Sequence, residues 1–392
     1  MRIGIDARSI LNPEKSEAIG VGHYTYQLIR HLLKIDQENE YVLFFDYHVR
    51  EKDVQKFSKQ NVTIKYFPWS DYKKYLPGAY SEILGLATIS GYKLDVLHCT
   101  SPDARVPLGY RGKVLCTFQD LAMYQHPALF SKVKTLRTRY NRQAMAKRAD
   151  KIIAVSENTR QDLQQIFHLD EKQIEVIRNG VDARFFEPFA MDKQALKDDL
   201  AHKFKLEKDY ILFLGTLEPV KNISRLLEAF KAFKEHLKQK GKKHDYQLAI
   251  AGKRGWLAQE YIQTAKDLNI IDDVRFLGYV EGDEVVKLFN GAKLFVMPSL
   301  YEGFGMSVLE AMASGVPCLV SDIPPLREIG ENAVEYVNPL DVEGMVNKLV
   351  EMVENTEHVK ELAIKGKEQA KKFSWDDCAQ RTLDLYHRIS GK

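Results

Sequence analysis

Short apolar runs alternate with amphipathic stretches along the chain. In the first half, residues 24–33 and 81–89 carry apolar side chains at helical spacing, and the runs between such stretches predict strands. This alternation is typical of parallel βαβ units. The predicted strands of this half are Ile3–Asp6, Tyr41–Phe45, Val62–Tyr66, Asp95–Cys99, Val114–Phe118, Ile152–Ser156 and Ile174–Ile177.

The alternation restarts after a polar, charge-rich stretch that runs from about residue 188 to residue 209. The restart predicts two doubly wound α/β domains, joined near residues 185–205. We place the first domain at residues 1–187 and the second at residues 188–374, with a helical tail at residues 375–392. The predicted strands of the second half are Tyr210–Gly215, Gln247–Gly252, Val274–Gly278, Leu294–Met297, Pro317–Ser321 and Val334–Val337.

Length and composition describe an ordinary globular protein. A chain of 392 residues is long enough for two cores, and a net charge of +3 gives no indication of a nucleic-acid partner. The 4 cysteines show no CxxC spacing, which favours free thiols in a reducing compartment. No apolar run reaches the ~18 residues that span a bilayer, and the first residues resemble a strand more than a signal peptide. We therefore expect a cytoplasmic protein.

A glycine loop follows the first predicted strand. Gly20 and Gly22 precede a helix that begins near Tyr24, and their missing side chains would let backbone N–H groups approach an anion. Turns alone also use such glycines. The third glycine of a dinucleotide fingerprint is absent, because Thr25 stands there, and this argues against a nucleotide-dependent oxidoreductase.

Two basic loops follow strands of the second half. In "FLGTLEPVKN", the chain leaves a strand through Gly215 and places Lys221 where the next helix begins. A lysine there opposes the helix dipole, so phosphate binding explains it better than helix propensity, although a solvated lysine is the alternative. In "AGKRGW", Lys253 and Arg254 follow the next strand. Because parallel strands end at one edge of a sheet, the two loops together predict a diphosphate site.

The segment "SLYEGFGMSVLEAMASG" carries two glutamates eight positions apart. Glu302 lies in the loop after a strand, where we expect a sugar, and Gly303 and Gly305 allow close approach of the backbone to a ligand. The helix that follows would present unpaired N–H groups to a phosphate from its first residues, Met306, Ser307 and Val308. Glu310 lies about one turn inside that helix and could accept hydrogen bonds from ribose hydroxyls.

These motifs resemble the retaining GT-B glycosyltransferases of family 4. The resemblance rests on Glu-x7-Glu within "EGFGMSVLEAMASGVPCLVSD", with "GTLEPVKN", "GKRGW", "VRFLGYV", "AVSENTRQDL", "RNGVD" and "FSWDDCAQRTLDLY", and covers nearly the whole chain. The second-half loops are most similar to the branch of bacterial O-antigen mannosyltransferases. The resemblance implies two Rossmann-like domains facing across a cleft, the first binding the acceptor and the second the nucleotide sugar. It also implies that the tail helix crosses back to the first domain.

The resemblance also implies residue roles. Glu302 would contact the transferred sugar, Glu310 would hold the ribose, and Lys221 would neutralise the diphosphate. The implied donor-binding residues are Gly20, Gly22, Gly215, Thr216, Lys221, Lys253, Arg254, Phe276, Gly278, Tyr279, Glu302, Gly303, Phe304, Gly305, Met306, Ser307, Val308 and Glu310. The implied catalytic residues are Glu302, Lys221, Gln119 and Asp120.

The chain departs from the family pattern at two places. Thr216 and Val220 stand where many members carry arginine, so Lys253 or Arg254 would supply the missing charge. Gln119 stands where many members carry the histidine of a His-Asp pair, beside Asp120. Glutamine can hydrogen-bond a hydroxyl but cannot carry charge, so a mechanism that needs a histidine base does not fit this chain.

The expected reaction is transfer of a sugar, with retention, from a nucleotide diphosphate sugar to a glycan or lipid-linked acceptor in cell-surface polysaccharide synthesis. GDP-mannose is the expected donor, and UDP-glucose or UDP-N-acetylglucosamine is the alternative. A non-catalytic sugar-nucleotide binding protein is a second alternative. The chain contains no Asp-x-Asp, so we expect neither a metal nor another cofactor.

Residues 131–151 are strongly basic. Leu136, Tyr140 and the pair Ala144–Met145 recur at helical spacing and predict one apolar stripe among cations. A solvated helix face is one explanation, and contact with an anionic membrane surface, on its inner face, is the other. The basic residues, set against the single acid Asp150, are Lys132, Lys134, Arg137, Arg139, Arg142, Lys147, Arg148 and Lys151.

Overall fold

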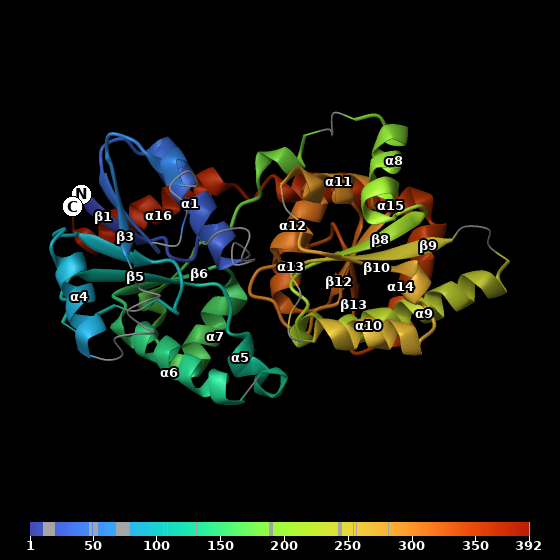
Figure 1. Ribbon diagram of the computed structural model, residues 1–392, viewed down its shortest axis with the longest axis horizontal. Helices are drawn as coiled ribbons and strands as arrows, with labels where there is room; N and C mark the ends of the chain where they lie inside the picture. Colours follow the sequence, from blue (N-terminus) through green and yellow to red (C-terminus); the bar gives the residue numbers. More distant parts are fainter. Residues whose placement is uncertain are drawn as a thin grey trace. The chain divides into compact units, whose positions relative to one another are not determined.

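The computed structural model describes residues 1–392 except 11–19, 47–48, 50–53, 68–78, 105, 108, 131, 188–190, 242–244, 254, 256, 281 and 392. The chain divides into two compact units. Unit 1 comprises Met1–Gly180 and Ser374–Lys392, and unit 2 comprises Val181–Phe373. Each unit is a parallel sheet flanked by helices, so the predicted α/β class with two doubly wound domains is confirmed (Figure 1).

The sheet of unit 1 has seven strands in the order β3-β2-β1-β4-β5-β6-β7. Its central strands are almost entirely buried, as expected for parallel strands that helices cover on both faces. All seven predicted strands are present. They are β1 (Arg2–Asp6), β2 (Glu40–Asp46), β3 (Val62–Phe67), β4 (Val96–Cys99), β5 (Lys113–Phe118), β6 (Lys151–Ala154) and β7 (Ile174–Val176).

The helices of unit 1 lie on both faces of this sheet (Figure 1). Leu86, Met145 and Phe167, from α4, α6 and α7, share one hydrophobic core with the strands. The α-helices are α1 (Val21–Ile35), α4 (Ala79–Ser90), α5 (Ala122–Gln125), α6 (Lys132–Arg148), α7 (Glu157–Phe167) and α16 (Trp375–Ser390), and the 3₁₀ turns are η2 (Gln55–Phe57), η3 (Pro127–Leu129) and η4 (Glu171–Gln173).

Helix α16, at the end of the chain, belongs to unit 1 and packs beside α1. The hydroxyl of Ser374 caps it by accepting a hydrogen bond from the Asp376 N–H at 3.1 Å. The buried Tyr386 hydroxyl lies 2.7 Å from Nδ1 of His98 on β4. Burial lowers the pKa of His98 to about 3, so this contact is made by a neutral imidazole. Buried polar and apolar contacts therefore fix the tail helix to the first sheet.

The sheet of unit 2 has six strands in the order β10-β9-β8-β11-β12-β13. The order reverses between β8 and β11, and in such sheets ligands bind where the order reverses, beyond the carboxyl ends of the strands. All six predicted strands are present. They are β8 (Asp209–Leu214), β9 (Tyr246–Ala251), β10 (Val274–Gly278), β11 (Leu294–Met297), β12 (Cys318–Ser321) and β13 (Glu335–Val337).

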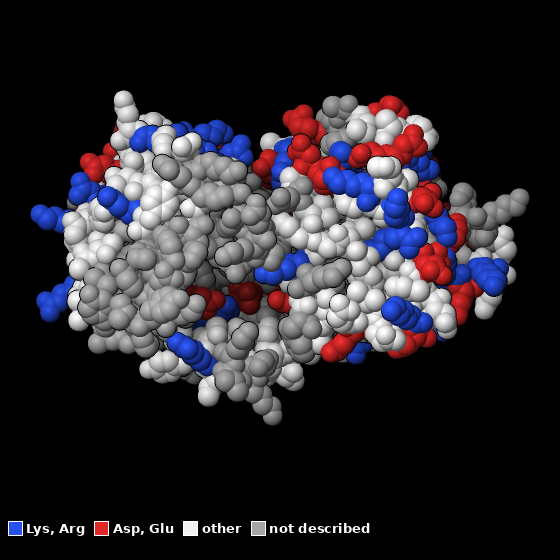
Figure 2. All heavy atoms as spheres, viewed as in Figure 1, with Lys and Arg blue, Asp and Glu red and all other residues white. Residues whose placement is uncertain are grey.

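Helices again cover the sheet of unit 2, with α9 packed on α14, α8 on α11 and α12 on α15 (Figure 1). On the face of this unit shown in Figure 2, acidic and basic side chains are interspersed. The elements are η5 (Ala183–Phe185), α8 (Lys193–Phe204), η6 (Pro219–Lys221), α9 (Ile223–Gln239), α10 (Ala258–Asp267), η7 (Ile271–Asp273), α11 (Asp283–Gly291), α12 (Met306–Ala313), α13 (Pro324–Gly330), α14 (Val342–Glu354) and α15 (Thr356–Ala370).

The division between the units falls after Gly180, seven residues before the boundary at 187 that the sequence suggested. Phe185 is buried against Phe289 of α11, with ring centroids 5.8 Å apart, so residues 181–187 belong to the second core. The polar stretch interpreted as a junction contains helix α8, which buries Leu196 and Leu200. At the other end, the tail joins unit 1 from Ser374.

Candidate active site

The loops after β8, β9 and β10 are packed directly on one another. Gly215 donates its N–H to the Ala251 carbonyl at 3.0 Å, and Gly252 donates to the Gly278 carbonyl at 2.8 Å. Gly252 has a φ of +146°, and a Cβ there would lie 1.9 Å from the Gly215 carbonyl oxygen. Only glycine fits this approach. The structure thus brings the predicted residues Gly215, Lys253 and Gly278 to one edge of the second sheet.

Asn222 joins the β8 loop to the β11 loop. Its backbone is left-handed, with a φ of 60°, a conformation that asparagine tolerates better than most residues. Its buried Nδ2 donates to the carbonyls of Pro298, at 3.0 Å, and Pro339, at 2.7 Å. The sequence did not single out Asn222, because the two carbonyls come from distant segments.

Lys221 and Glu302 meet at the end of these loops. Nζ of Lys221 lies 2.7 Å from Oε1 of Glu302, and the Ser299 hydroxyl donates to the same oxygen at 2.7 Å. Glu302 is only 9% exposed. Its second oxygen, Oε2, takes no hydrogen bond from any residue that the structure describes. The predicted phosphate-binding cation and sugar-binding acid are therefore neighbours, and Ser299, which the sequence did not single out, orients the acid.

Gly305 precedes α12 with a φ of +106°. A Cβ on it would lie 2.6 Å from Cδ2 of Leu326, so packing against α13 requires this glycine independently of any ligand. The N–H of Val308, a buried residue, donates to the Gly305 carbonyl at 3.0 Å. The helical pattern therefore leaves the N–H groups of Met306 and Ser307 for an anion, and Val308 lacks the free N–H group that the sequence assigned to it.

Glu310 projects from α12 and is partly exposed. Burial raises the pKa of its carboxyl to about 7, while Arg184 acts to lower the pKa and Asp182 to raise it. Its carboxyl group takes no hydrogen bond from the described part of the chain. Arg184 and Asp182 come from the segment that the sequence assigned to the first domain. The carboxyl group is thus available to a ligand.

Other predicted donor residues also lie in unit 2. Phe304 is buried, its ring centroid 5.9 Å from that of Phe373, so only its backbone could reach a ligand. Thr216 and Tyr279, in the loops after β8 and β10, and Phe276, within β10, are partly exposed. Arg254, the second predicted cation of the "AGKRGW" loop, lies outside the described residues.

The remaining predicted residues lie in unit 1. Gly20, with a φ of +64°, directly precedes α1, and Gly22 is in the first turn of that helix. Gln119 follows β5, and its Oε1 accepts a long hydrogen bond, 3.4 Å, from Nδ2 of Asn179. Asp120 accepts a hydrogen bond from the Ala122 N–H at 3.1 Å. The catalytic roles of Gln119 and Asp120 stay predictions.

Arg142 lies close to Asp120. It makes two hydrogen bonds to Asp103, at 2.9 and 2.8 Å, and its Nη1 lies 3.9 Å from Asp120. Paired bonds of this kind between a guanidinium and a carboxylate hold both groups in one geometry. The sequence counted Arg142 among the surface cations of residues 131–151, but its side chain is only 12% exposed, so that assignment is wrong. Arg142 supports the loop that carries Asp120.

The apolar stripe predicted on α6 is divided between two faces. Leu136 and Tyr140 are 75% and 73% exposed, and Ala144 is exposed as well. Met145 is buried in the core of unit 1. The residues at positions i, i+4 and i+8 therefore form the exposed stripe, and Met145 belongs to the opposite face. Two large apolar side chains remain unburied on the helix that also exposes Arg137 and Lys147.

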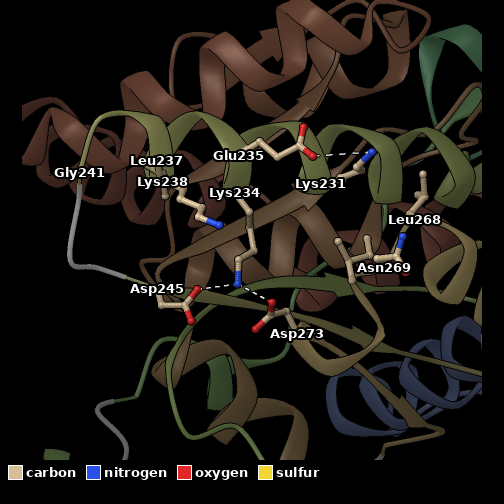
Figure 3. Close-up of a pocket in the computed structure, with 11 residues that line it drawn as sticks. Lys231, Lys234, Glu235, Leu237, Lys238, Gly241, Asp245, Leu268, Asn269 and Asp273 are labelled. Atoms are coloured by element: carbon tan, nitrogen blue, oxygen red, sulfur yellow. Dashed lines mark hydrogen bonds and ion pairs between the residues drawn. The ribbon is translucent and has the colours of Figure 1, made fainter.

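A groove of about 700 Å³ lies near the amino ends of β9 and β10 in unit 2, at the opposite ends of these strands from the loops described above (Figure 3). Lys234 bridges Asp245 and Asp273 there, at 2.6 and 2.5 Å. Lys208 pairs with the same two acids. Because these charges neutralise one another away from the carboxyl ends of the strands, the groove is a weaker candidate for a sugar-nucleotide site than the loops around Lys221.

Two further features concern the described residues alone. They contain no group of three or more His, Cys, Asp or Glu side chains placed to hold a metal ion. No helix among them combines the length and the apolar character needed to cross a bilayer.

Comparison with protein families gives two matches that together cover most of the chain. Residues 194–369 match the model described as "Glycosyl transferases group 1". Residues 19–185 match the model described as "Glycosyltransferase Family 4". The two matches fall largely on unit 2 and unit 1, respectively.

Curated relatives include enzymes of O-antigen synthesis. O-antigen chain mannosyltransferase B of Escherichia coli is 27% identical over 278 residues, 70% of each chain. O-antigen chain mannosyltransferase RfbU of Salmonella typhimurium is 30% identical over 67% of this chain and 66% of its own. The serotype-specific mannosyltransferase WbdA of Escherichia coli is 28% identical, but the match spans only 34% of that longer protein.

Solved structures share the fold over nearly the whole chain. HepE of Anabaena, in complex with UDP and glucose, has a TM-score of 0.75 at 17% identity and covers 98% of this chain and 99% of its own. WaaG, a glycosyltransferase of lipopolysaccharide biosynthesis, has a TM-score of 0.71 at 13% identity, with coverage of 98% and 99%. At such identities the likeness establishes the fold.

Proposed function

The chain belongs to the group 1 and family 4 glycosyltransferases of GT-B fold, and we propose that it transfers mannose, with retention of configuration, from GDP-mannose to a glycan or lipid-linked acceptor. The observation that carries this proposal is the Lys221–Glu302 pair between the loops after β8 and β11. One loop offers a cation for a diphosphate and the other a carboxylate for a sugar. Glu310, about one turn inside α12, offers a second carboxyl group for ribose hydroxyls.

The mechanism follows from where charge develops. When the sugar leaves, negative charge grows on the diphosphate and positive charge on the sugar ring. An ammonium group has three N–H donors, so Lys221 can hold Glu302 with one of them and phosphate oxygens with the others. The N–H groups of Met306 and Ser307 would also direct the positive ends of their dipoles toward the diphosphate. Fixed charges and dipoles of this kind stabilise a transition state because they need no reorganisation during the reaction.

A double displacement needs a nucleophilic carboxylate placed as in retaining glycosidases. Glu302 is already held by Lys221 and Ser299, and in this proposal the carboxyl group of Glu310 binds the ribose. We therefore assign both acids to donor binding and propose that the acceptor hydroxyl attacks the face from which the diphosphate departs. The leaving phosphate would take the acceptor's proton. No metal is required in this scheme, because Lys221 and the helix N–H groups face the diphosphate.

The choice of GDP-mannose is supported by the mannosyltransferase names of the curated relatives. UDP-glucose is the second candidate, because HepE, which shares the fold, was solved in complex with it. A non-catalytic sugar-nucleotide binding protein is the third. Calorimetric titration of the protein with GDP and with UDP separates the first two, and preferential binding of UDP would overturn the choice of mannose. Transfer of label from donor to acceptor separates both from the third.

The exposed stripe on α6 supports a membrane-bound acceptor. Leu136 and Tyr140 are large, exposed apolar side chains, and the same helix exposes the cations Arg137 and Lys147. Apolar side chains beside cations match the interface of an anionic bilayer. We therefore propose that α6 rests reversibly on such a surface, where a lipid-linked acceptor would be found.

A further inference from the structure

Two neighbouring side-chain amides in unit 1 leave part of their hydrogen-bonding capacity unused. Asn179 Nδ2 donates to Gln119 Oε1 at 3.4 Å. Nε2 of Gln119 and Oδ1 of Asn179 are buried and have no partner among the described residues. Asn179 as a whole is only 2% exposed. A buried polar atom without a partner is costly, so a native protein that keeps two of them side by side normally supplies a partner from outside the chain.

The unused atoms have complementary character. An amide has two N–H donors and a carbonyl acceptor, and the bond between the two amides uses one donor and one acceptor position. Among the described residues, one whole amide nitrogen, Nε2 of Gln119, and one carbonyl oxygen, Oδ1 of Asn179, therefore remain without a partner. If both amides were turned over, the same pair of functions would remain with the residues exchanged. A hydroxyl group, which donates one hydrogen bond and accepts others, satisfies both, whereas a phosphate satisfies only the donor.

The two residues are held in place by their surroundings. Asn179 follows β7, and the next residue, Gly180, passes so close to the tail that a Cβ would lie 2.1 Å from the Trp375 nitrogen. The Ile177 N–H, two residues before Asn179, donates to the Ala154 carbonyl at 3.0 Å. Gln119 directly follows the buried end of β5. Both amides thus sit at the carboxyl edge of the first sheet, where ligands of such sheets bind.

We propose that Gln119 and Asn179 act together as an amide pair that binds one hydroxyl group of a sugar substrate, with Gln119 donating to the hydroxyl oxygen and Asn179 accepting its hydrogen. This inference rests on the proposed sugar transfer and deepens it, because it adds Asn179 as a specificity residue. A sugar hydroxyl of the donor and one of the acceptor have the same chemistry. Deoxy analogues of the donor and of the acceptor distinguish these two hydroxyl groups.

The test asks whether each amide interacts with one particular hydroxyl group of a substrate. Gln119→Met and Asn179→Leu keep the approximate size of each side chain and remove its polar atoms. The kcat/KM of the parent protein and of each variant is measured with monodeoxy donor sugars in one arm and monodeoxy acceptor sugars in the other. With intact substrates we expect each variant to lose about tenfold or more in kcat/KM. For the one analogue that lacks the bound hydroxyl, the kcat/KM of the parent should fall by a similar factor. The kcat/KM of each variant should then be only slightly lower with this analogue than with the intact substrate.

Asn61→Leu is the matched control. Its amide directly precedes β3, at the amino ends of the strands of the first sheet, and donates to the Asn39 carbonyl at 2.9 Å. This substitution should not change kcat/KM selectively for any one analogue. Thermal melts and GDP titrations of each variant report whether the fold and the unit 2 site persist. Should Asn179→Leu fail to fold, Gln119→Met, at a partly exposed position, carries the test.

The outcomes separate this inference from the function on which it rests. A parent that transfers no sugar from any donor contradicts both. A parent that transfers sugar, with variants that lose the same factor on every analogue or lose nothing, contradicts the amide pair alone and indicates that water satisfies the two atoms. Coupling to a donor hydroxyl or to an acceptor hydroxyl supports the pair and identifies which substrate it binds.

Discussion

Lys221 and Glu302 are 81 residues apart in sequence, yet Nζ of the first lies 2.7 Å from Oε1 of the second. Their side chains are only 19% and 10% exposed, so the pair is shielded from water more than a surface salt bridge would be. Asn222 connects the two loops independently through Pro298. The pair therefore keeps a cation and a carboxylate at a fixed spacing.

The first prediction compares Glu302 with Glu310. Glu302→Gln removes the charge that holds Lys221 while keeping the shape, and we expect kcat to fall by about 100-fold with a smaller change in KM. Glu310→Ala removes contacts made in the ground and transition states alike, so KM should rise with little change in kcat. Steady-state kinetics measure both, with the exposed Glu357→Gln as the control. Near-parental kinetics in both variants would rule out these loops as the donor site.

The second prediction concerns pH. Glu310 has a pKa of about 7 in the folded protein, above the 4.5 of an ordinary glutamate, because burial disfavours its charged form. As pH rises, the unfolded chain loses this proton first, so the stabilisation present below about pH 4.5 is lost by about pH 7. Glu310→Gln cannot lose a proton. Its Tm, relative to that of the parent, should therefore increase between pH 4.5 and pH 7 and stay constant above pH 7.

Melting curves of the two proteins at matched ionic strength test this prediction. The same variant should bind GDP more weakly at pH 8, where the parent carries the charge. A difference in Tm that does not change across this pH range would show that Glu310 titrates as an ordinary surface acid.

The third prediction is metal independence. The positive charge facing the diphosphate comes from Lys221 and helix N–H groups in our account, so a chelator should leave the initial rate of sugar transfer within about twofold of its starting value. The rate is measured in excess EDTA and again after addition of magnesium or manganese. Loss of most activity in EDTA that either ion restores would show that a metal binds the diphosphate.

The fourth prediction concerns α6. Salt-sensitive binding to vesicles that contain anionic lipid should weaken when Arg137 and Lys147 are replaced by Ser, by about 1 kcal/mol for each cation. Leu136→Ser with Tyr140→Ser should weaken binding further. Arg142 must be left unchanged, because its ion pair with Asp103 belongs to the fold. Replacement of Ile364 by Ser, an exposed apolar side chain in unit 2, is the control.

Vesicle co-sedimentation at low and high salt measures these effects, and GDP titration confirms that each variant keeps its donor site. A parent protein that ignores anionic vesicles at low salt would show that the exposed stripe on α6 is an ordinary solvated surface.

The strands and most site loops could be predicted from the sequence because each depends on a local pattern. Leu294–Met297 is an apolar run, and Gly305 marks the turn into the helix that carries Glu310. Contacts between distant segments could not be predicted in this way. Nothing near Asn222 indicates that its amide bonds Pro298 and Pro339.

Two errors have a common physical origin. The stretch around α8 seemed to be a linker because its charges outnumber its apolar residues, yet Leu196 and Leu200 suffice to attach it to unit 2. Arg142 seemed to be a surface cation because its partner, Asp103, is 39 residues away in the sequence. In both cases burial depends on a partner that periodicity does not reveal.

We propose that Lys221 and Glu302 bind a nucleotide sugar for retaining transfer of mannose. The most direct measurement incubates the protein with GDP-mannose and a lipid-extract acceptor and determines the anomeric configuration of the product by NMR. We predict mannose transfer with the donor's α configuration, at least about 100-fold slower in Glu302→Gln. A β-linked product, transfer that does not depend on Glu302, or no transfer from GDP-mannose or any other nucleotide sugar would overturn this assignment of the two residues.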